Sequence, residues 1–133
     1  MRFIMNTTYL ELNHITLAYN TPEGPKVVVN DLNLAVEKGH IGCLLGASGC
    51  GKTTVLRAIA GFEPLRAGTI HLDGQLLSSS EGAVVPEKRN VGMMFQDYAL
   101  FPHMNVFDNV AFGLRMKKTP KDEINAKVME ALD

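Results

Sequence analysis

A glycine-rich segment, residues 46–54, restricts the folds open to this chain more than any other feature. It contains the pattern Gly-x-x-x-x-Gly-Lys-Thr, and it stands between an apolar run at residues 40–45 and a helical pattern of apolar residues at 55–60. Glycines let successive backbone N–H groups converge on one anion, and a helix that begins there adds its free N–H groups and its dipole. The order of strand, glycine loop and helix therefore predicts a loop that binds the phosphates of a nucleoside triphosphate.

The residue types in this loop predict how a nucleotide and its Mg²⁺ are held. Lys52 can reach the outer phosphates, and the Thr53 hydroxyl is placed to ligate Mg²⁺. The alternative interpretation, a glycine-rich turn with an incidental lysine, does not explain the flanking strand and helix patterns. The candidate nucleotide-binding residues of the loop are Gly46, Ala47, Ser48, Gly49, Cys50, Gly51, Lys52, Thr53 and Thr54.

Cys50 lies inside this loop and has two interpretations. It is either a thiol whose alkylation blocks nucleotide binding or a small residue that merely fits. Its spacing from Cys43 matches neither a Cys-x-x-Cys redox pair nor a zinc site. Because two thiols make no disulfide framework, a reducing, cytoplasmic setting is expected.

Alternating apolar residues predict an antiparallel β layer at about residues 8–38 and 68–78. The alternation changes phase at Asn13-His14, which predicts a bulge in the first strand. The dipeptide Asp73-Gly74 favours a tight hairpin turn. The N-terminal part of the chain is therefore expected to be rich in antiparallel strands.

The remaining patterns alternate less and predict buried strands and helices. Residues 40–45 and 91–95 are mostly apolar at successive positions instead of alternating, which is typical of strands buried on both faces of a sheet. Residues 105–114 have helical spacing, and a second helix is expected to begin with Thr119 as N-cap and Pro120 at the first position. The apolar positions expected along these two helices are Val106, Val110, Leu114, Ile124, Val128 and Leu132.

Composition excludes several classes of protein. Hydrophobic residues make up 46% and charged residues 20% of the chain, which describes a foldable globular sequence rather than a disordered one. The formal net charge of −1 provides no global field for binding nucleic acid or an anionic lipid surface. The histidines share no metal-ligand spacing, and the basic pair Lys88-Arg89 is expected on a solvated face.

Four stretches together resemble the nucleotide-binding subunit of an ABC transporter: residues 45–57, 59–61, 68–74 and 91–106. The resemblance covers nearly the whole chain from Leu10 onward. It implies an α/β fold, a P-loop NTPase core with a partial parallel sheet and helices, preceded by an antiparallel β subdomain. The implied divisions of this single domain are the β layer, the phosphate loop with its strand and helix (40–61), a Q-loop region (91–106) and the start of a helical subdomain (105–133).

The resemblance also assigns roles outside the loop. Gln96 matches the Q-loop glutamine, which is implied to touch Mg²⁺ and the attacking water and to couple the nucleotide state to membrane subunits. Lys52 and Gln96 are then the expected catalytic residues, and Thr53 and Gln96 the expected Mg²⁺ ligands. Tyr19 matches the aromatic residue that stacks on adenine. From the residues alone, Gln96 could equally be a capping or turn residue and Tyr19 a core residue.

The function implied is Mg·ATP binding and hydrolysis coupled to solute import across the bacterial inner membrane. Ferric iron is the first expected substrate, and polyamine or sugar the alternative. Membrane permease subunits, a periplasmic solute-binding protein and a second copy of the ATP-binding subunit are the expected partners, with the protein peripheral on the cytoplasmic face. A noncatalytic nucleotide-binding module is the other hypothesis, and a metabolite kinase is disfavoured by the hairpin after the first helix.

Some expected catalytic groups are missing after Gln96. No run of four apolar residues followed by Asp or Glu occurs there to hold Mg²⁺, and neither a Leu-Ser-Gly-Gly-Gln signature nor a switch histidine is found. The segment is also too short for further strand, helix and strand units. We therefore expect an N-terminal portion of a longer protein that is inactive as an ATPase by itself.

Overall fold

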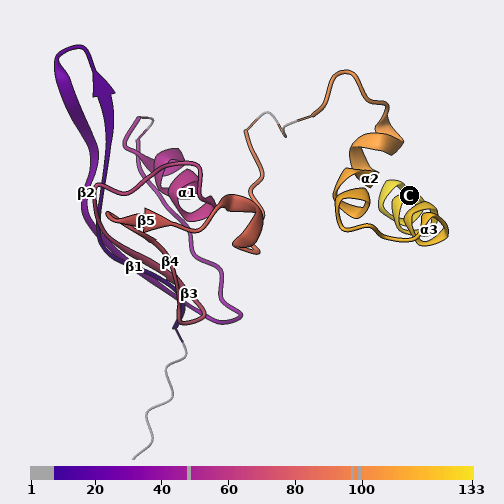
Figure 1. Ribbon diagram of the computed structural model, residues 1–133, viewed down its shortest axis with the longest axis horizontal. Coiled ribbons are helices and arrows are strands. Elements are labelled where there is room, and N and C mark those ends of the chain that lie inside the picture. Colours follow the sequence, from indigo (N-terminus) through magenta and orange to yellow (C-terminus); the bar gives the residue numbers. More distant parts are fainter. Residues whose placement is uncertain (1–7, 48, 97, 99) are drawn as a thin grey trace, which may run out of the picture. The chain divides into compact units, whose positions relative to one another are not determined.

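A computed structural model describes residues 8–47, 49–96, 98 and 100–133 (Figure 1). Internal contacts divide the chain into two units, Met1–Met93 and Met94–Asp133. The first unit carries the glycine loop and the second the C-terminal helices.

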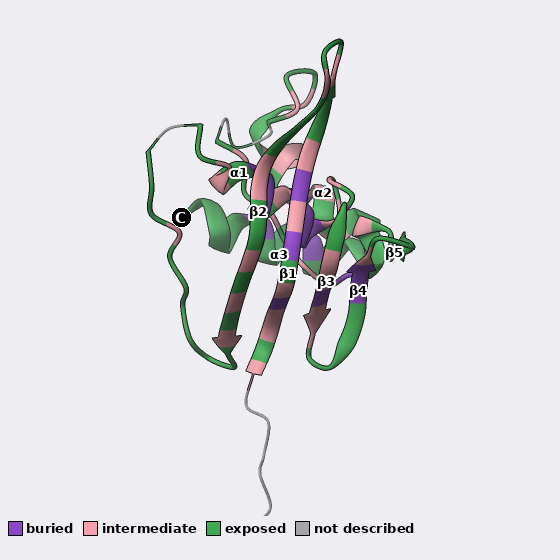
Figure 2. Cartoon of the chain, turned by 90° about the vertical axis from the view of Figure 1, so that its left-hand side faces the viewer, coloured by how far each residue is buried: buried purple, intermediate pink, exposed green. Residues whose placement is uncertain are grey.

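The first unit is built on a five-stranded antiparallel sheet with the order β2-β1-β3-β4-β5. Figure 2 shows the buried residues of the sheet on β1, β3 and β4. The strands are β1 (Thr8–Thr21), β2 (Gly24–Glu37), β3 (Ala67–Leu72), β4 (Gln75–Ser79) and β5 (Gly82–Ala83). The antiparallel β layer expected from the alternating residues is thus present.

The two local irregularities expected in this sheet are confirmed. The pairing of β1 with β2 shifts register between Leu12 and Ile15, and His14 between them has a φ of 49°. Asp73 and Gly74, between β3 and β4, have φ values of 50° and 79°, as a type I′ turn requires. The bulge keeps both Leu12 and Ile15 in the core, because it resets the alternation that an extra residue would otherwise invert.

One helix of the first unit, α1 (Lys52–Ala60), packs its apolar side against the sheet. It ends at Gly61, which has a φ of 100° and donates its N–H to the carbonyls of Arg57 and Ala58, as is common for a glycine at the end of a helix. The helix that begins at the glycine loop is therefore fixed by the main core. That core consists of Leu12, Ile15, Leu17, Val55, Ala58, Ile59, Leu65, Ile70 and Leu77.

Arg89 is buried, so the expectation of a solvated Lys88-Arg89 pair is wrong for the arginine. Only 2% of Arg89 is exposed, whereas Lys88 is exposed in the short 3-10 helix η1 (Pro86–Lys88). Burial lowers the pKa of the Arg89 guanidinium below its ordinary value. Its donors reach the C-terminal carbonyls of α1 and the strand β4, so it joins these elements. The acceptors are the carbonyl oxygens of Ala58 (3.2 Å), Ile59 (3.3 Å), Leu77 (3.2 Å) and Val84 (2.7 Å), and Oγ of Ser78 (2.7 Å).

The two strands expected to be buried on both faces are not formed. In the part of the chain that the structure describes, neither residues 40–45 nor residues 91–95 belong to a strand. Ile41 is 98% and Leu45 89% exposed. A strand of this kind needs hydrogen-bonded neighbours and covering layers on both faces. The described sheet is antiparallel and pairs with neither segment, and the partly buried Leu44 and Val91 pack against the main core without forming a strand.

The second unit is a pair of packed helices, α2 (Val106–Met116) and α3 (Lys121–Leu132). Ala111, Ile124 and Val128 are buried between them, with Phe107 and Leu114 packed against these residues. Of the apolar positions expected along α2, Leu114 packs in this contact, whereas Val106 and Val110 are exposed and Phe107 and Ala111 lie at the contact with α3. Leu132 of α3 is also exposed.

The start of α3 differs by one residue from the expectation. Pro120, not Thr119, is the N-cap, and its carbonyl accepts the N–H of Ile124 at 3.0 Å. The extended ψ of 143° at Pro120 places the change of direction there rather than at Thr119. Among the described residues, none of the helices combines the length and the apolar character needed to cross a membrane.

Candidate nucleotide-binding site

The glycine loop depends on two backbone conformations that other residues adopt with strain. Gly49 and Gly51 have φ values of 82° and 97°. A Cβ on Gly51 would lie 2.8 Å from Cγ2 of Val29 and 3.0 Å from the carbonyl oxygen of Val28. The loop thus passes directly against β2, and only glycine fits at its last turn before the helix. Ser48, another predicted loop residue, lies outside the described residues.

The first turn of α1 presents polar groups at the end of this loop. Its N-cap is Gly51, no described side chain caps the helix, and the first turn contains no acidic residue. Free N–H groups and the positive end of the helix dipole therefore remain at the loop, as an anion site requires. Lys52 Nζ donates a hydrogen bond to the carbonyl of Gly46, which holds the ammonium group across the loop.

Tyr19 reaches the same helix from the β1–β2 hairpin. Its hydroxyl lies 2.8 Å from Oγ1 of Thr54, which is only 8% exposed in α1. The tyrosine itself is 41% exposed and does not belong to the main core. The structure therefore brings the candidate base-stacking residue to the phosphate loop without burying it as a core residue.

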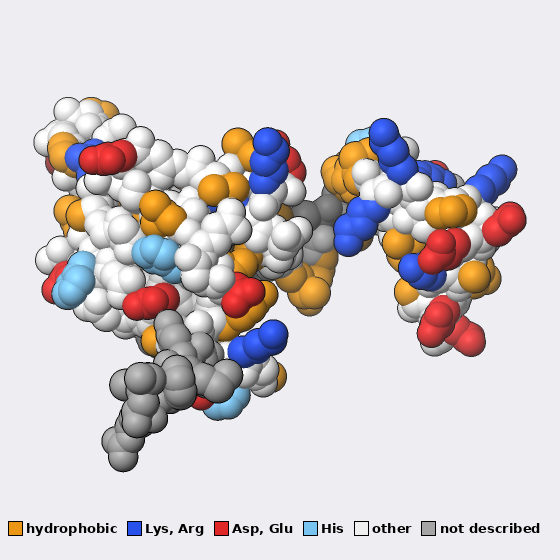
Figure 3. Space-filling model, turned by 60° about the horizontal axis from the view of Figure 1, so that its bottom comes forward, with side chains coloured by type: hydrophobic (Ala, Val, Ile, Leu, Met, Phe, Trp, Pro, Cys, Tyr) orange, Lys and Arg blue, Asp and Glu red, His pale blue; other side chains and the backbone are white. Residues whose placement is uncertain are grey.

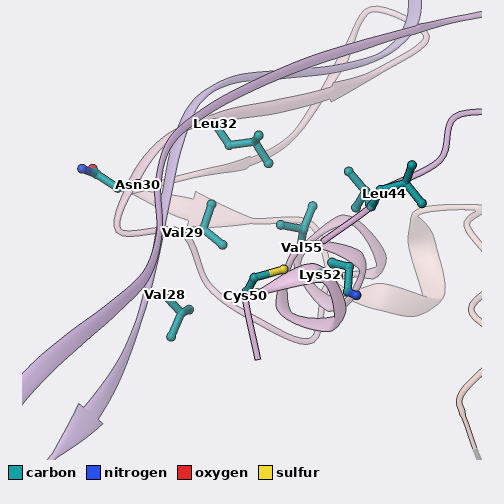
Figure 4. A pocket seen from close by; sticks show the side chains of 10 residues that line it. Val28, Val29, Asn30, Leu32, Leu44, Cys50, Lys52 and Val55 are labelled. Carbon is teal, nitrogen blue, oxygen red and sulfur yellow. The ribbon is translucent and has the colours of Figure 1, made fainter. Parts of the chain in front are cut away.

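A cavity of about 290 Å³ lies beside the loop, between β2 and α1. Figure 4 shows Val28, Val29 and Leu32 on one side of it and Cys50, Lys52 and Val55 on the other. Most of its lining is apolar, and Cys50, Gly51 and Lys52 of the glycine loop line it as well. The lining residues are Val28, Val29, Asn30, Leu32, Leu44, Leu45, Cys50, Gly51, Lys52 and Val55.

Gln96 and Thr53 occupy different units. Thr53 is exposed in the first turn of α1, so its hydroxyl is accessible to a metal ion. Gln96 is exposed in a turn of the second unit. A joint role of the two residues as Mg²⁺ ligands stays a prediction, as does the catalytic role of Gln96.

Alkylation of Cys50 should block nucleotide binding, and Mg·ATP should slow the alkylation. The Cys50 Sγ lies 2.7 Å from the position that a Cβ on Gly46 would take, so the exposed thiol lies directly against the backbone of the loop. A maleimide adduct there must displace loop backbone that is needed for the phosphates. Treatment of Cys43→Ser protein with N-ethylmaleimide, followed by calorimetric titration with Mg·ATP, measures the block.

The matched control for this experiment is Cys50→Ser, which leaves Cys43 as the only thiol. Both cysteines are exposed, so both should react. Alkylation at Cys43 should not lower the affinity of the Cys50→Ser protein for Mg·ATP. An adduct at Cys50 that leaves ATP affinity intact would show that the thiol is merely a small residue that fits.

A phosphate loop that ends on a helix packed against a sheet, with a lysine across its opening, defines a P-loop nucleotide-binding protein. Comparison with families of known proteins gives the particular class. The family model described as "ABC transporter" matches residues 29–133, and the chain belongs to this family. The resemblance inferred from residues 45–57 and 91–106 is confirmed.

Curated relatives match the chain along nearly its whole length. It is 52% identical over 132 residues to the spermidine/putrescine import ATP-binding protein PotA of Haemophilus ducreyi, covering 99% of this chain and 33% of the relative. It is 58% identical over 107 residues to PotA of Vibrio parahaemolyticus, covering 80% and 27%. PotA of Bacteroides thetaiotaomicron is 46% identical over 123 residues, with 92% and 25% covered. The chain thus spans about a third or less of the length of these relatives.

Solved structures confirm the α/β fold class of an ABC cassette. The dimeric bacterial ABC transporter cassette MJ0796 matches with a TM-score of 0.81 at 23% identity, covering 92% of this chain and 55% of that one. CbiO1 from Clostridium perfringens, part of the ABC transporter complex cbiONQ, matches with a TM-score of 0.71 at 29% identity, covering 96% and 50%.

Proposed function

We propose that this chain is the part of the ATP-binding subunit of a bacterial polyamine importer that binds the nucleotide. The observation that carries the proposal is the loop at residues 46–51, which delivers Lys52 and the uncapped N-terminus of α1 to one point. The identity of about 50% to proteins named for spermidine and putrescine import supports the polyamine. The comparisons give no support to ferric iron, the first substrate expected from the sequence.

In this proposal the loop residues bind Mg·ATP and stabilise the charge on the transferred phosphoryl group. Backbone N–H groups of residues 46–54 surround the phosphates, and Lys52 binds the outer ones. Thr53 supplies a hydroxyl oxygen to Mg²⁺, which prefers oxygen ligands, and its exposed position in the first turn fits that role. The metal ion supplies further neutralisation of phosphate charge. Gln96 binds Mg²⁺ and orients the attacking water, and Tyr19 stacks on adenine.

The proposed partners are membrane permease subunits, a periplasmic solute-binding protein and a second copy of the full-length subunit. The protein would lie on the cytoplasmic face of the inner membrane. Figure 3 shows acidic and basic side chains interspersed over the visible described surface, which accords with the net charge of −1. Such a surface suits docking on protein better than attraction to anionic lipid.

The second candidate function, nucleotide binding without hydrolysis, applies to the 133-residue chain taken by itself. The described residues after Gln96 form two helices and no strand that ends in an acidic residue. We therefore expect the chain alone to show no ATP turnover above background in a phosphate-release assay. Turnover by this chain would contradict the proposal that essential groups lie elsewhere in the protein.

The proposed substrate is tested with the full-length protein and its permease in inner-membrane vesicles. Spermidine or putrescine, added with the binding protein, should stimulate ATP hydrolysis and accumulate in the vesicle lumen. Ferric citrate with the same components should do neither. Stimulation by ferric citrate but not by either polyamine would overturn the assignment of the substrate.

A further inference from the structure

We propose that the hydrogen bond between Tyr19 and Thr54 is a positioning device. It holds the aromatic ring at the N-terminal end of α1, so that base recognition and phosphate recognition keep a fixed geometry. The inference rests on the proposed function, because it assigns a task to two residues of the proposed nucleotide site. Thr54 is then a positioning residue for the base, in addition to its place in the phosphate loop.

The position of Tyr19 on its strand explains why the ring needs an anchor. The buried core residues of β1 end at Leu17, and Tyr19 pairs with Lys26 in the part of the hairpin beyond them. The ring is 41% exposed, so core packing does not fix its direction. Among the described residues, Thr54 is the hydrogen-bond partner given for the Tyr19 hydroxyl, at 2.8 Å.

Thr54 is suited to be that anchor because it cannot move freely. It is the third residue of α1, it is buried, and the next residue, Val55, belongs to the main core. A hydroxyl group has one proton to donate and two lone pairs to accept with. Thr54 can therefore accept the Tyr19 proton and donate its own to a nucleotide oxygen at the same time. The ring and the phosphate loop are then linked through the hydroxyl group of Thr54.

The test compares two ligands, Mg·ATP and inorganic tripolyphosphate with Mg²⁺, on the full-length protein. Tyr19→Phe keeps the ring and removes the hydroxyl. We expect it to weaken ATP binding by about 3- to 10-fold, the range that corresponds to one net hydrogen bond, and to leave tripolyphosphate binding unchanged. The matched control is Tyr9→Phe, which removes a hydroxyl near the other end of the same strand. It should change neither affinity.

A double-mutant cycle separates this contact from the direct role of Thr54 at the phosphates. The effect of Tyr19→Phe on ATP affinity should disappear in a Thr54→Val background and return in a Thr54→Ser background, which restores the hydroxyl. Thermal melting of each variant identifies any that fail to fold. An equal loss of ATP and tripolyphosphate affinity in Tyr19→Phe would overturn the proposal, since the bond would then shape the loop and not the ring.

The outcomes also distinguish this inference from the proposed function. If Lys52→Ala abolishes binding of both ligands while Tyr19→Phe behaves as the unsubstituted protein, the nucleotide site stands and the positioning role of Thr54 is overturned. If Lys52→Ala leaves the affinity for both ligands unchanged, the proposed nucleotide site is wrong, and the positioning role fails with it.

Discussion

Replacement of Arg89 by alanine should lower the free energy of unfolding by about 3–5 kcal/mol, because each buried acceptor left without a donor costs about 1–3 kcal/mol and more than one is affected. The side chain is 2% exposed and donates to four carbonyls and one hydroxyl. Two of these acceptors, Ala58 and Ile59, are at the C-terminal end of α1, where a cation also interacts favourably with the helix dipole. The carbonyls of Ala58 and Leu77 keep backbone donors, the N–H groups of Gly61 and Val84, so the cost falls on the other acceptors and on the lost packing of the buried side chain. Urea denaturation followed by circular dichroism measures this cost.

Arg89→Lys and Arg66→Ala are the informative controls. Lysine keeps the charge but lacks the planar guanidinium group, whose donors reach α1 and β4 at the same time. Most of the stabilisation that Arg89 contributes should therefore still be lost. Arg66 is exposed and donates one hydrogen bond, to Asn20 at 2.8 Å, so its removal should cost about 1 kcal/mol or less. An Arg89→Ala protein that unfolds at the same urea concentration as Arg66→Ala would contradict a joining role for Arg89.

Replacement of Lys52 by alanine should lower the affinity for Mg·ATP by at least about 100-fold, beyond the range of ordinary calorimetric titration. The estimate follows from the loss of two charge-assisted hydrogen bonds to phosphate, at about 1.5–3 kcal/mol each. Nζ of Lys52 is held across the loop by the carbonyl of Gly46, so the charge is already placed at the phosphate site. Because the backbone of the loop does not depend on this side chain for its glycine conformations, the fold should survive the change.

Lys38→Ala is the charge-matched control for this prediction. Lys38 is exposed just after β2, outside the loop, and its removal changes the net charge by the same amount. ATP affinity should stay within about 2-fold of the unsubstituted protein, because charges well outside the site are screened at physiological salt. Equal ATP affinities for Lys52→Ala and Lys38→Ala would refute the assignment of the loop.

Features that arise from neighbouring residues were predictable from the sequence. The bulge at Asn13-His14, the hairpin turn at Asp73-Gly74 and the end of α1 at Gly61 each follow from the conformational preferences of one or two residues. The candidate nucleotide site rests on the same kind of local pattern, the glycine spacing and the following lysine, and it stays a prediction. The prediction of which side of α2 is buried was less accurate. Val110 and Ala111 are adjacent in the sequence, and only packing against α3 decides which of them is buried.

Features that join distant residues were not predictable. Nothing in the local pattern around Arg89 distinguishes it from a solvated arginine like its exposed neighbour Lys88, and its acceptors are 5 to 31 residues away in the sequence. The Tyr19–Thr54 bond spans 35 residues. The prediction for residues 40–45 is wrong for a related reason. Their apolar pattern predicts a buried strand, but it does not supply the neighbouring strands that would bury it.

The sequence by itself thus determined the glycine-rich loop pattern, the helix that follows it and membership of the ABC transporter family. Only the tertiary structure decided which side chains support that loop. The backbone conformation of the loop, and its ability to bind an anion, depend on residues that are close together in the sequence. The burial of Arg89 and the anchoring of Tyr19 depend instead on where the sheet, α1 and the segment around residue 89 meet in space.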